Sequence, residues 1–185
     1  LRTMSSSKLG SRVVVMGVFD GLHEGHMALF EAARRDAGHR GLPLTVVTFD
    51  KDPDELFGRE PESFKLMANE ARLDALRKSR RVGASEVVAI KTDRDSLSIE
   101  APDFLGKLAE LIDVASIHVG ADFRFGRKAA GTVDDISAWC EHIGAACCPQ
   151  ELFEAEGEVV TATRIRSLLE QGDADAVAKL DPGYV

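Results

Sequence analysis

The sequence predicts an α/β fold in which a mostly parallel sheet is flanked by helices. Short runs rich in β-branched residues alternate with longer stretches of helical periodicity along the 185 residues. The runs are continuously apolar, as expected of strands that are covered on both faces. Because a helical stretch separates each run from the next, the strands are expected to lie parallel in one sheet.

The expected elements follow one another in a regular order. The expected strands are RVVVMGVF at 12–19, LTVVTF at 44–49, EVVAIK at 86–91, SIHVG at 116–120 and EVVTAT at 158–163. The expected helices lie at about 25–37, 69–81, 101–112 and 133–143, with two shorter ones after residue 163.

Length and composition are those of an ordinary globular chain. The 44% of apolar residues is enough for a packed core. From the length of the chain, residues 1–185 are expected to form a single domain. The formal net charge of -8 disfavours a protein that binds the nucleic-acid backbone. A local basic pocket for a phosphorylated small molecule is compatible with this charge.

Cysteine content and apolar run lengths indicate the compartment. Cys140, Cys147 and Cys148 are odd in number and have no C-x-x-C spacing, so they predict neither a disulfide framework nor a zinc knuckle. No apolar run approaches the roughly 18 residues that span a bilayer, and the first residues lack the apolar core of a secretion signal. We therefore expect a cytoplasmic protein with no membrane partner.

Two irregular segments are candidate parts of a site. Residues 50–64 and 122–132 are rich in glycine, proline and charged residues, and each follows an expected strand. In open α/β sheets, ligands bind beyond the carboxyl ends of the strands. The second segment carries Asp122, Phe123 and Phe125, and phenylalanines are more often core residues than ring-stacking ones.

The segment GVFDGLHEGHMALF, residues 17–30, contains two histidines around a glycine. His23 and His26 are three residues apart, so both side chains project from one face of the first turn of the expected helix. Because Gly25 has no side chain, a phosphate group could approach the N–H groups at the helix start while both imidazoles reach it. This arrangement indicates phosphoryl or nucleotidyl transfer. A metal pair with Asp20 as the nearest third ligand, or two surface histidines, are the alternatives.

The segment TATRIRSLLEQG, residues 161–172, predicts a strand end followed by a helix. Thr163 is expected near the N-cap of this helix and Gly172 at its end. Threonine hydroxyls, backbone N–H groups and one arginine would form a second anion site. Arg164 and Arg166 are two residues apart and point to different faces, so at most one should reach the ligand. An ordinary cap with two solvated arginines is the alternative.

Four blocks occur together in this chain: GVFDGLHEGH, TFDKDP, VGADFRFGRKAAG and TATRIR. In this combination, over residues 13–184, they resemble the FMN adenylyltransferase module of the bacterial bifunctional riboflavin kinase/FAD synthetase family. The first block alone is the H-x-G-H signature of the wider nucleotidyltransferase superfamily. The resemblance implies a Rossmann-like nucleotidyltransferase fold and the reaction of ATP with FMN to give FAD and pyrophosphate, with Mg²⁺. We assign no protein residue as a metal ligand.

The resemblance also implies roles for individual residues. His23, His26 and Arg166 would be catalytic, holding the ATP phosphates and the transition state. Asp122 would lie in the flavin or magnesium region. The residues expected to bind the nucleotide are Gly17, Phe19, Gly25, Thr161, Thr163 and Arg164. The residues expected around the flavin are Asp52, Asp122, Phe123 and Phe125.

Three departures from the family pattern bear on activity. Where the family has Pro-His-Pro, this chain has Lys51, Asp52 and Pro53, and a carboxylate there would repel phosphate unless Mg²⁺ or Lys51 compensates. The two serines of the family's Ser-Ser-Thr-x-x-Arg motif are Thr161 and Ala162, and alanine cannot make a hydroxyl bond worth about 0.5–1.5 kcal/mol. The chain ends at DPGYV, about where the linker to the family's riboflavin kinase module would begin. The kinase domain is therefore expected to be absent, and a separate riboflavin kinase is a candidate partner.

Two other functions stay open. If Asp52 and Ala162 have reduced the activity, the chain would be a catalytically weakened flavin- or nucleotide-binding homologue. If the acceptor differs, it would be a nucleotidyltransferase acting on another phosphorylated small molecule. In each case the ligands are small-molecule nucleotides and not nucleic acid.

Overall fold

A five-stranded parallel sheet forms the centre of the computed structural model, which describes residues 8–53 and 65–181. The strand order is β3-β2-β1-β4-β5. The strands are β1 (Leu9–Met16), β2 (Leu44–Phe49), β3 (Glu86–Ile90), β4 (Ile112–Gly120) and β5 (Ala146–Gln150). The chain starts in the middle of the sheet, moves outward to β3, and then returns to β4. This doubly wound order confirms the predicted Rossmann-like fold, and its switch point lies between β1 and β4.

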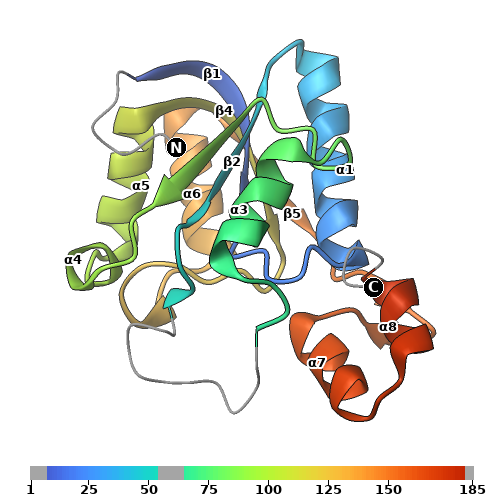
Figure 1. Ribbon diagram of the computed structural model, residues 1–185. Coiled ribbons are helices and arrows are strands. Elements are labelled where there is room, and N and C mark those ends of the chain that lie inside the picture. Colours follow the sequence, from blue (N-terminus) through green and yellow to red (C-terminus); the bar gives the residue numbers. More distant parts are fainter. Residues whose placement is uncertain (1–7, 54–64, 182–185) are drawn as a thin grey trace.

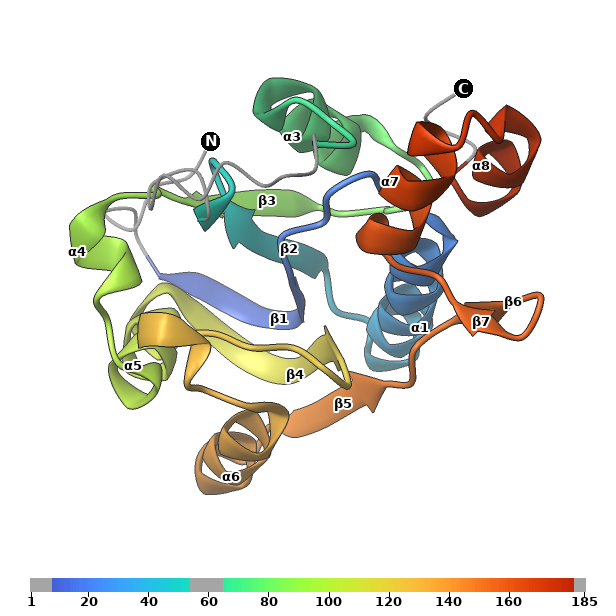
Figure 2. The ribbon, with the colours of Figure 1, turned by 90° about the horizontal axis from the view of Figure 1, so that it is seen from below.

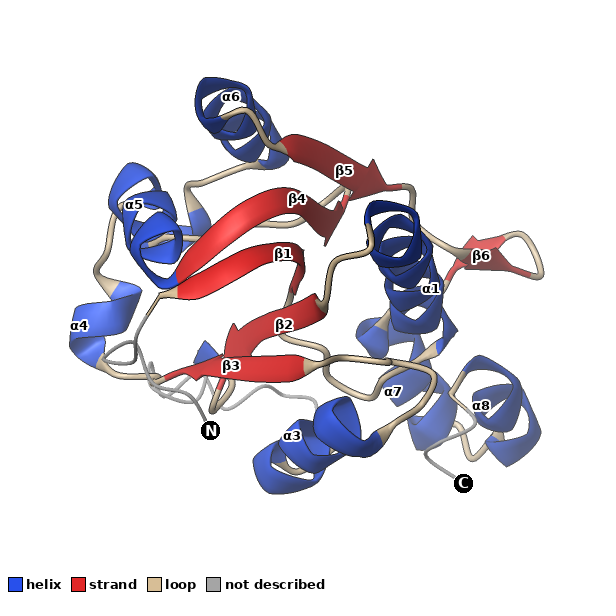
Figure 3. Cartoon of the chain, turned by 90° about the horizontal axis from the view of Figure 1, so that it is seen from above, coloured by secondary structure: helices blue, strands red, loops and turns tan. Residues whose placement is uncertain are grey.

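Helices cover both faces of the sheet (Figure 2). One face carries α1 and α3, and the other carries α5 and α6 (Figure 3). Their bounds are α1 (Glu24–Arg40), α3 (Asn69–Lys78), α5 (Ala101–Leu111) and α6 (Val133–Ile143), with the single turn α4 (Arg94–Leu97) before α5. Along β1, Val13 and Val15 pack toward α1, whereas Val14 and Met16 pack toward α5 and α6. The continuous valine run is therefore explained by burial on both faces.

A small helical unit follows the sheet. It consists of the hairpin β6 (Glu154–Ala155) and β7 (Glu158–Val159) and the helices α7 (Ala162–Glu170) and α8 (Ala174–Leu180). Ile165, Val177 and Leu180 form its apolar core together with Leu66 and Val160. The unit lies beside the first turn of α1 (Figure 1).

The last predicted strand is wrong. Within the run 158–163 only β7 is a strand, and it pairs antiparallel with β6 outside the main sheet. The fifth strand of the main sheet is β5, with the sequence ACCPQ, which has no β-branched residue. Pro149 is tolerated because β5 is an edge strand that pairs only with β4.

Several element bounds differ from the prediction. β1 covers residues 9–16 instead of 12–19, because the chain leaves the sheet at Gly17, and β4 begins at Ile112. The helix expected at 133–143 is confirmed. Among the described residues, no helix is both long and apolar enough to pass through a lipid bilayer.

Candidate active site

Two adjoining cavities lie at the carboxyl ends of the strands. One has a volume of about 610 Å³ and the other about 440 Å³. Met16, Gly17, Val18 and Phe123 line both cavities. We call residues 16–18, at the end of β1, the junction strip. Since Phe123 follows β4, the cavities meet at the switch point between β1 and β4, where ligands bind in such folds.

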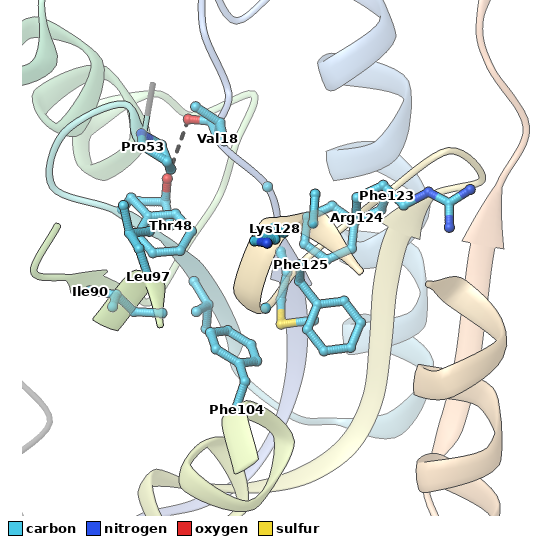
Figure 4. A pocket seen from close by; sticks show the side chains of 16 residues that line it. Val18, Thr48, Pro53, Ile90, Leu97, Phe104, Phe123, Arg124, Phe125 and Lys128 are labelled. Carbon is cyan, nitrogen blue, oxygen red and sulfur yellow. Dashed lines mark hydrogen bonds between the residues drawn. The ribbon is translucent and has the colours of Figure 1, made fainter. Parts of the chain in front are cut away.

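The larger cavity, which we call the aromatic cavity, is lined by phenylalanines (Figure 4). The rings of Phe104 and Phe125 have centroids 5.5 Å apart, and Phe123 stacks on Phe125 at 6.0 Å with 9° between the planes. Arg124 and Lys128 add positive charge to the lining. A flat aromatic ring with an anionic substituent matches this combination of apolar walls and cations. Phe123 and Phe125 are therefore both packed residues and cavity walls.

The smaller cavity, which we call the histidine cavity, is lined by both predicted histidines. His23 is the N-cap residue of α1, and its side chain makes no capping bond. Its ring stacks on that of His26, with centroids 3.7 Å apart and 20° between the planes. The Nδ1 atoms of both rings are buried and have no hydrogen-bond partner among the described residues.

Both histidines are neutral near pH 7. Burial lowers the pKa of His23 to about 4, although the charge of Asp20 acts in the opposite direction. Burial and the neighbouring His23 hold the pKa of His26 well below its usual range. Before an anion arrives, the pair can therefore donate hydrogen bonds but does not supply fixed positive charge.

The ring of Phe19 packs against the ring of His26. It packs edge-on against His26 at 5.3 Å between centroids and against Phe30 at 4.9 Å. The backbone of Phe19 has φ 61°, which is an outlier for a bulky residue. A Cβ at Gly17 would lie 2.7 Å from the Phe19 ring, so glycine is needed there. Both residues line the histidine cavity, and the Phe19 ring packs against one of its histidines.

Gly25 joins the two sequence motifs. A Cβ at this position would lie 3.1 Å from the His23 ring and 3.1 Å from the carbonyl oxygen of Val160. The missing side chain thus lets the start of α1 pack against the segment that leads into α7. Gly25 also lines the histidine cavity. Its main structural effect is this close contact between segments that are distant in the sequence.

Arg166 and Asp20, which both line the histidine cavity, form an ion pair. Their side chains are 16% and 10% exposed, and the guanidinium donates to the Asp20 carboxylate at 2.5 Å. Asp20 also accepts hydrogen bonds from the backbone N–H groups of Leu66 and Met67 at 3.3 and 3.1 Å. The carboxylate therefore anchors α7 and the segment before α3. The metal pair with Asp20 as third ligand does not appear among the described groups of potential metal ligands.

The start of α7 differs from the prediction by two residues. The N-cap is Thr161, whose hydroxyl accepts from the N–H of Arg164 at 3.1 Å, and not Thr163, which is exposed. Thr161 and Ala162 line the histidine cavity. Arg164 instead donates to the carbonyl oxygens of Ala155 and Glu158 and thereby holds the β6–β7 hairpin. Thr163 and Arg164 line neither cavity, whereas Arg166 does, in agreement with the spacing argument.

Asp52 and Asp122 lie in the histidine cavity and not in the aromatic one. The expected flavin group is thus divided, since Phe125 lines only the aromatic cavity. Lys65 lies near Asp52. Burial lowers the pKa of Lys65, and the charges of Asp52 and Asp20 oppose this effect. Lys65 is therefore a cation near Asp52 that the sequence argument did not consider, although it lines neither cavity. Residues 54–64 of the first candidate loop lie outside the described residues.

Sequence reasoning missed two further parts of the site. Leu152 and Phe153 line the histidine cavity and are 42% and 40% exposed. They follow β5, and a correct strand assignment at 146–150 would have marked them as candidates. The second is Arg72, which is buried behind the junction strip. Arg72 lies four residues before Leu76 in α3, so the sequence places it on the apolar face of this helix.

A family model and several curated proteins match this chain, and their names agree with one another. Residues 5–164 match the family model described as FAD synthetase. The chain is similar to three proteins named bifunctional riboflavin kinase/FMN adenylyltransferase. Identity is 29% with that of Pseudomonas fluorescens (91% of this chain, 53% of that protein) and 28% with that of Escherichia coli K12 (91% and 53%). It is 26% with that of Bacillus subtilis (88% and 51%). The chain thus spans about half the length of these curated relatives.

One solved structure shares the fold over nearly the whole chain. It is named as a macrolide-efflux protein from Streptococcus pneumoniae. The TM-score is 0.77 at 26% sequence identity, and the match covers 95% of this chain and 55% of that one.

Proposed function

Because the chain belongs to the FAD synthetase family, we propose that it transfers AMP from ATP to FMN, giving FAD and pyrophosphate. The observation that supports this most directly is the contact of two unlike cavities along the junction strip. The aromatic cavity suits a flavin ring, and the histidine cavity suits a triphosphate. A reaction between two phosphate groups requires this kind of shared boundary.

Alignment and charge neutralisation carry the reaction. An oxygen of the FMN phosphate attacks the α-phosphorus of ATP, the bond from that phosphorus to the bridging oxygen breaks, and pyrophosphate leaves with the electron pair. Because the attacking phosphate is already ionised at neutral pH, no general base is required.

The protein groups have distinct tasks in this scheme. His23 and His26 donate hydrogen bonds to the phosphates, and the charge of the phosphates raises the pKa of both imidazoles. Arg166 supplies a positively charged guanidinium to the same cavity. Asp20 holds Arg166 in place while the guanidinium faces the cavity. These groups oppose the charge that builds on the transferred phosphorus and on the leaving pyrophosphate.

Mg²⁺ is the metal that the family resemblance implies. Mg²⁺ prefers oxygen ligands and usually binds through one or two carboxylates together with substrate phosphates. Asp52 and Asp122 offer carboxylates in the histidine cavity, so the residues present fit such an ion. When bound, it would neutralise charge on the triphosphate.

Detection of FAD by chromatography, after incubation with ATP, FMN and Mg²⁺, tests the proposal. We expect FAD and pyrophosphate in equal amounts, and no FAD without ATP. Other phosphorylated acceptors, including nicotinamide mononucleotide, are assayed in parallel. Nucleotidylation of one of these without FAD formation would overturn the assignment of FMN as acceptor.

A flavin-binding protein without turnover is the second candidate that the sequence leaves open, and the two departures behind it, Asp52 and Ala162, line the histidine cavity. Flavin binding with no pyrophosphate release from any nucleotide would support it. The double substitution Asp52→His and Ala162→Ser would then restore turnover if those two positions caused the loss.

A further inference from the structure

Arg72 is a buried cation on α3 that contacts the ends of two strands. Its side chain is among the largest fully buried ones, with 2% of its surface exposed. The guanidinium donates to the carbonyl oxygen of Val18 at 2.8 Å and to that of Phe49 at 2.7 Å. It also donates to the hydroxyl of Thr48 at 2.9 Å and to the carbonyl oxygen of Asp50 at 3.4 Å. Arg72 therefore links the loop after β1 to the end of β2.

None of these described hydrogen bonds goes to a carboxylate. Burial lowers the pKa of Arg72, and the charges of Asp20, Asp52 and Asp50 oppose this effect from a distance. The guanidinium stays ionised, since an arginine does not lose its proton in proteins. A buried charge often stabilises a fold no better than a well-packed apolar side chain of similar size. We therefore explain the buried position of Arg72 by the backbone segments that its hydrogen bonds hold in place, and not by a gain in fold stability.

The bonds hold the wall that the two cavities share. Val18 belongs to the junction strip, and Thr48 and Phe49 line the aromatic cavity. Thr48 also donates to the carbonyl oxygen of Val18 at 3.3 Å (Figure 4). One carbonyl therefore receives two donors, which fixes the orientation of the peptide between Val18 and Phe19.

That peptide leads into the unusual backbone of Phe19. A left-handed conformation at a bulky residue persists only where its surroundings hold it. The Phe19 ring in turn packs against His26. A chain of contacts therefore runs from Arg72 through Val18 and Phe19 to the histidine pair.

We propose that Arg72 is a positioning residue: from behind the junction strip it fixes the boundary at which the two bound substrates meet. The inference rests on the proposed function for its effect on turnover. Its structural part, the fixing of the strip, does not depend on the identity of the substrates.

The test compares Arg72→Met with Arg77→Met. Methionine replaces the unbranched apolar stem of the Arg72 side chain and removes the guanidinium with its charge and donors. Arg77 lies on the same helix, but its described ion pair is with Asp74 at the surface, at 3.4 Å, so it is the matched control. Four quantities are measured: kcat at saturating ATP and FMN, the Kd of each ligand alone, the melting temperature, and hydrogen exchange of peptides that cover residues 14–20 and 47–52.

We expect Arg72→Met to lower kcat about 100-fold, because a displacement of about 1 Å between reacting groups has this effect. The Kd values should change only a few-fold, since most of each cavity is intact. Exchange should rise in the two strand-end peptides and not in α1. Arg72→Lys, which keeps the charge and some of the donors, should have a kcat between those of Arg72→Met and the parent. Arg77→Met should match the parent in every quantity.

Three results would overturn the inference. The first is a kcat for Arg72→Met within three-fold of the parent. The second is unchanged exchange in both peptides. The third is a parallel loss of kcat, ligand binding and melting temperature, which would indicate a merely structural role. If the parent chain makes no FAD but the exchange result holds, the proposed function fails and the fixing of the strip stands.

Discussion

A histidine pair lies at the start of α1, and a cluster of a carboxylate with a histidine lies toward its end, with opposite outcomes. At its start, His23 and His26 line a cavity, and their Nδ1 atoms have no partner among the described residues. Further along, Asp36 accepts hydrogen bonds from Ser116, His118 and Arg40. Burial would raise the pKa of Asp36, but these hydrogen bonds lower it to about 2. The histidine pair is therefore available to a ligand, whereas the Asp36 carboxylate is already bound by side chains of the protein.

The comparison shows what marks a site in this fold. Asp36, His118 and Cys148 are the one group of three potential metal ligands among residues 8–53 and 65–181, yet the Asp36 carboxylate already has three donors. The Nδ1 atom of His118 also lacks a described partner, but His118 lines neither cavity. An unpartnered nitrogen therefore indicates a site only where a cavity lies in front of it.

The largest effect is expected from His26→Leu. It should lower kcat/KM for FAD formation about 1000-fold, or about 4 kcal/mol, because a preorganised donor to the phosphates is lost. His118→Leu should leave kcat/KM within about three-fold of the parent and lower the melting temperature instead. Initial rates and thermal unfolding measure both effects. Equal losses of activity in the two variants would remove the distinction between the clusters.

A pH dependence of stability should come from His23. Its folded pKa of about 4 lies below the ordinary value of 6.5, so the unfolded chain binds more protons between these values. The contribution of His23 to the free energy of unfolding should therefore be fully present above pH 6.5. It should be lost as the pH decreases toward 4, by about 3 kcal/mol in all. His23→Asn should remove this contribution, as followed by urea unfolding at several pH values. The exposed His142, changed to Asn, is the control, and an unchanged slope in His23→Asn would contradict the account.

Arg166 and Arg164 provide a matched pair on one helix. Arg166→Met removes a cation that lines the histidine cavity and leaves Asp20 without this partner, so kcat/KM should fall about 100-fold, or about 2.7 kcal/mol. Arg164→Met removes only bonds to the hairpin and should lower stability with little change in kcat/KM. Steady-state kinetics of the two variants show which arginine contributes to kcat/KM. A greater loss of rate in Arg164→Met would show that the wrong arginine was assigned.

The smallest effect is expected from Asp36→Asn. The folded pKa of about 2 lies below the ordinary 3.8, so Asp36 stabilises the protein above pH 3.8, and this stabilisation is lost as the pH falls through 2. Because its partner Arg40 is partly exposed, the loss near pH 7 should be only about 1 kcal/mol. FAD formation should be unchanged. A large decrease in rate with normal stability would place this cluster in the reaction.

Much of the fold follows from local patterns in the sequence. The valine runs predict β1, β2 and β3, because strands buried on two faces must be apolar throughout. The ACCPQ strand was missed because its position depends on pairing with β4 and not on its own composition. The distinction between Arg164 and Arg166 was predictable, since residues two apart on a helix face different directions.

The remaining parts of the site depend on contacts between distant segments. Asp20 and Arg166 are 146 positions apart, and Arg72 bonds to Val18 across 54 positions. Local periodicity contains no information on such pairs. The neutral state of the histidines likewise arises from burial, which the spacing of His23 and His26 does not reveal.

A crystal structure with FMN and an ATP analogue that has a methylene bridge between the α- and β-phosphorus tests the central claim most directly. We predict the flavin ring in the aromatic cavity beside Phe125 and the phosphates against His26 and Arg166. The FMN phosphate and the α-phosphorus should then meet at the junction strip. Phosphates bound away from His26 and Arg166, or a flavin ring outside the aromatic cavity, would contradict the account.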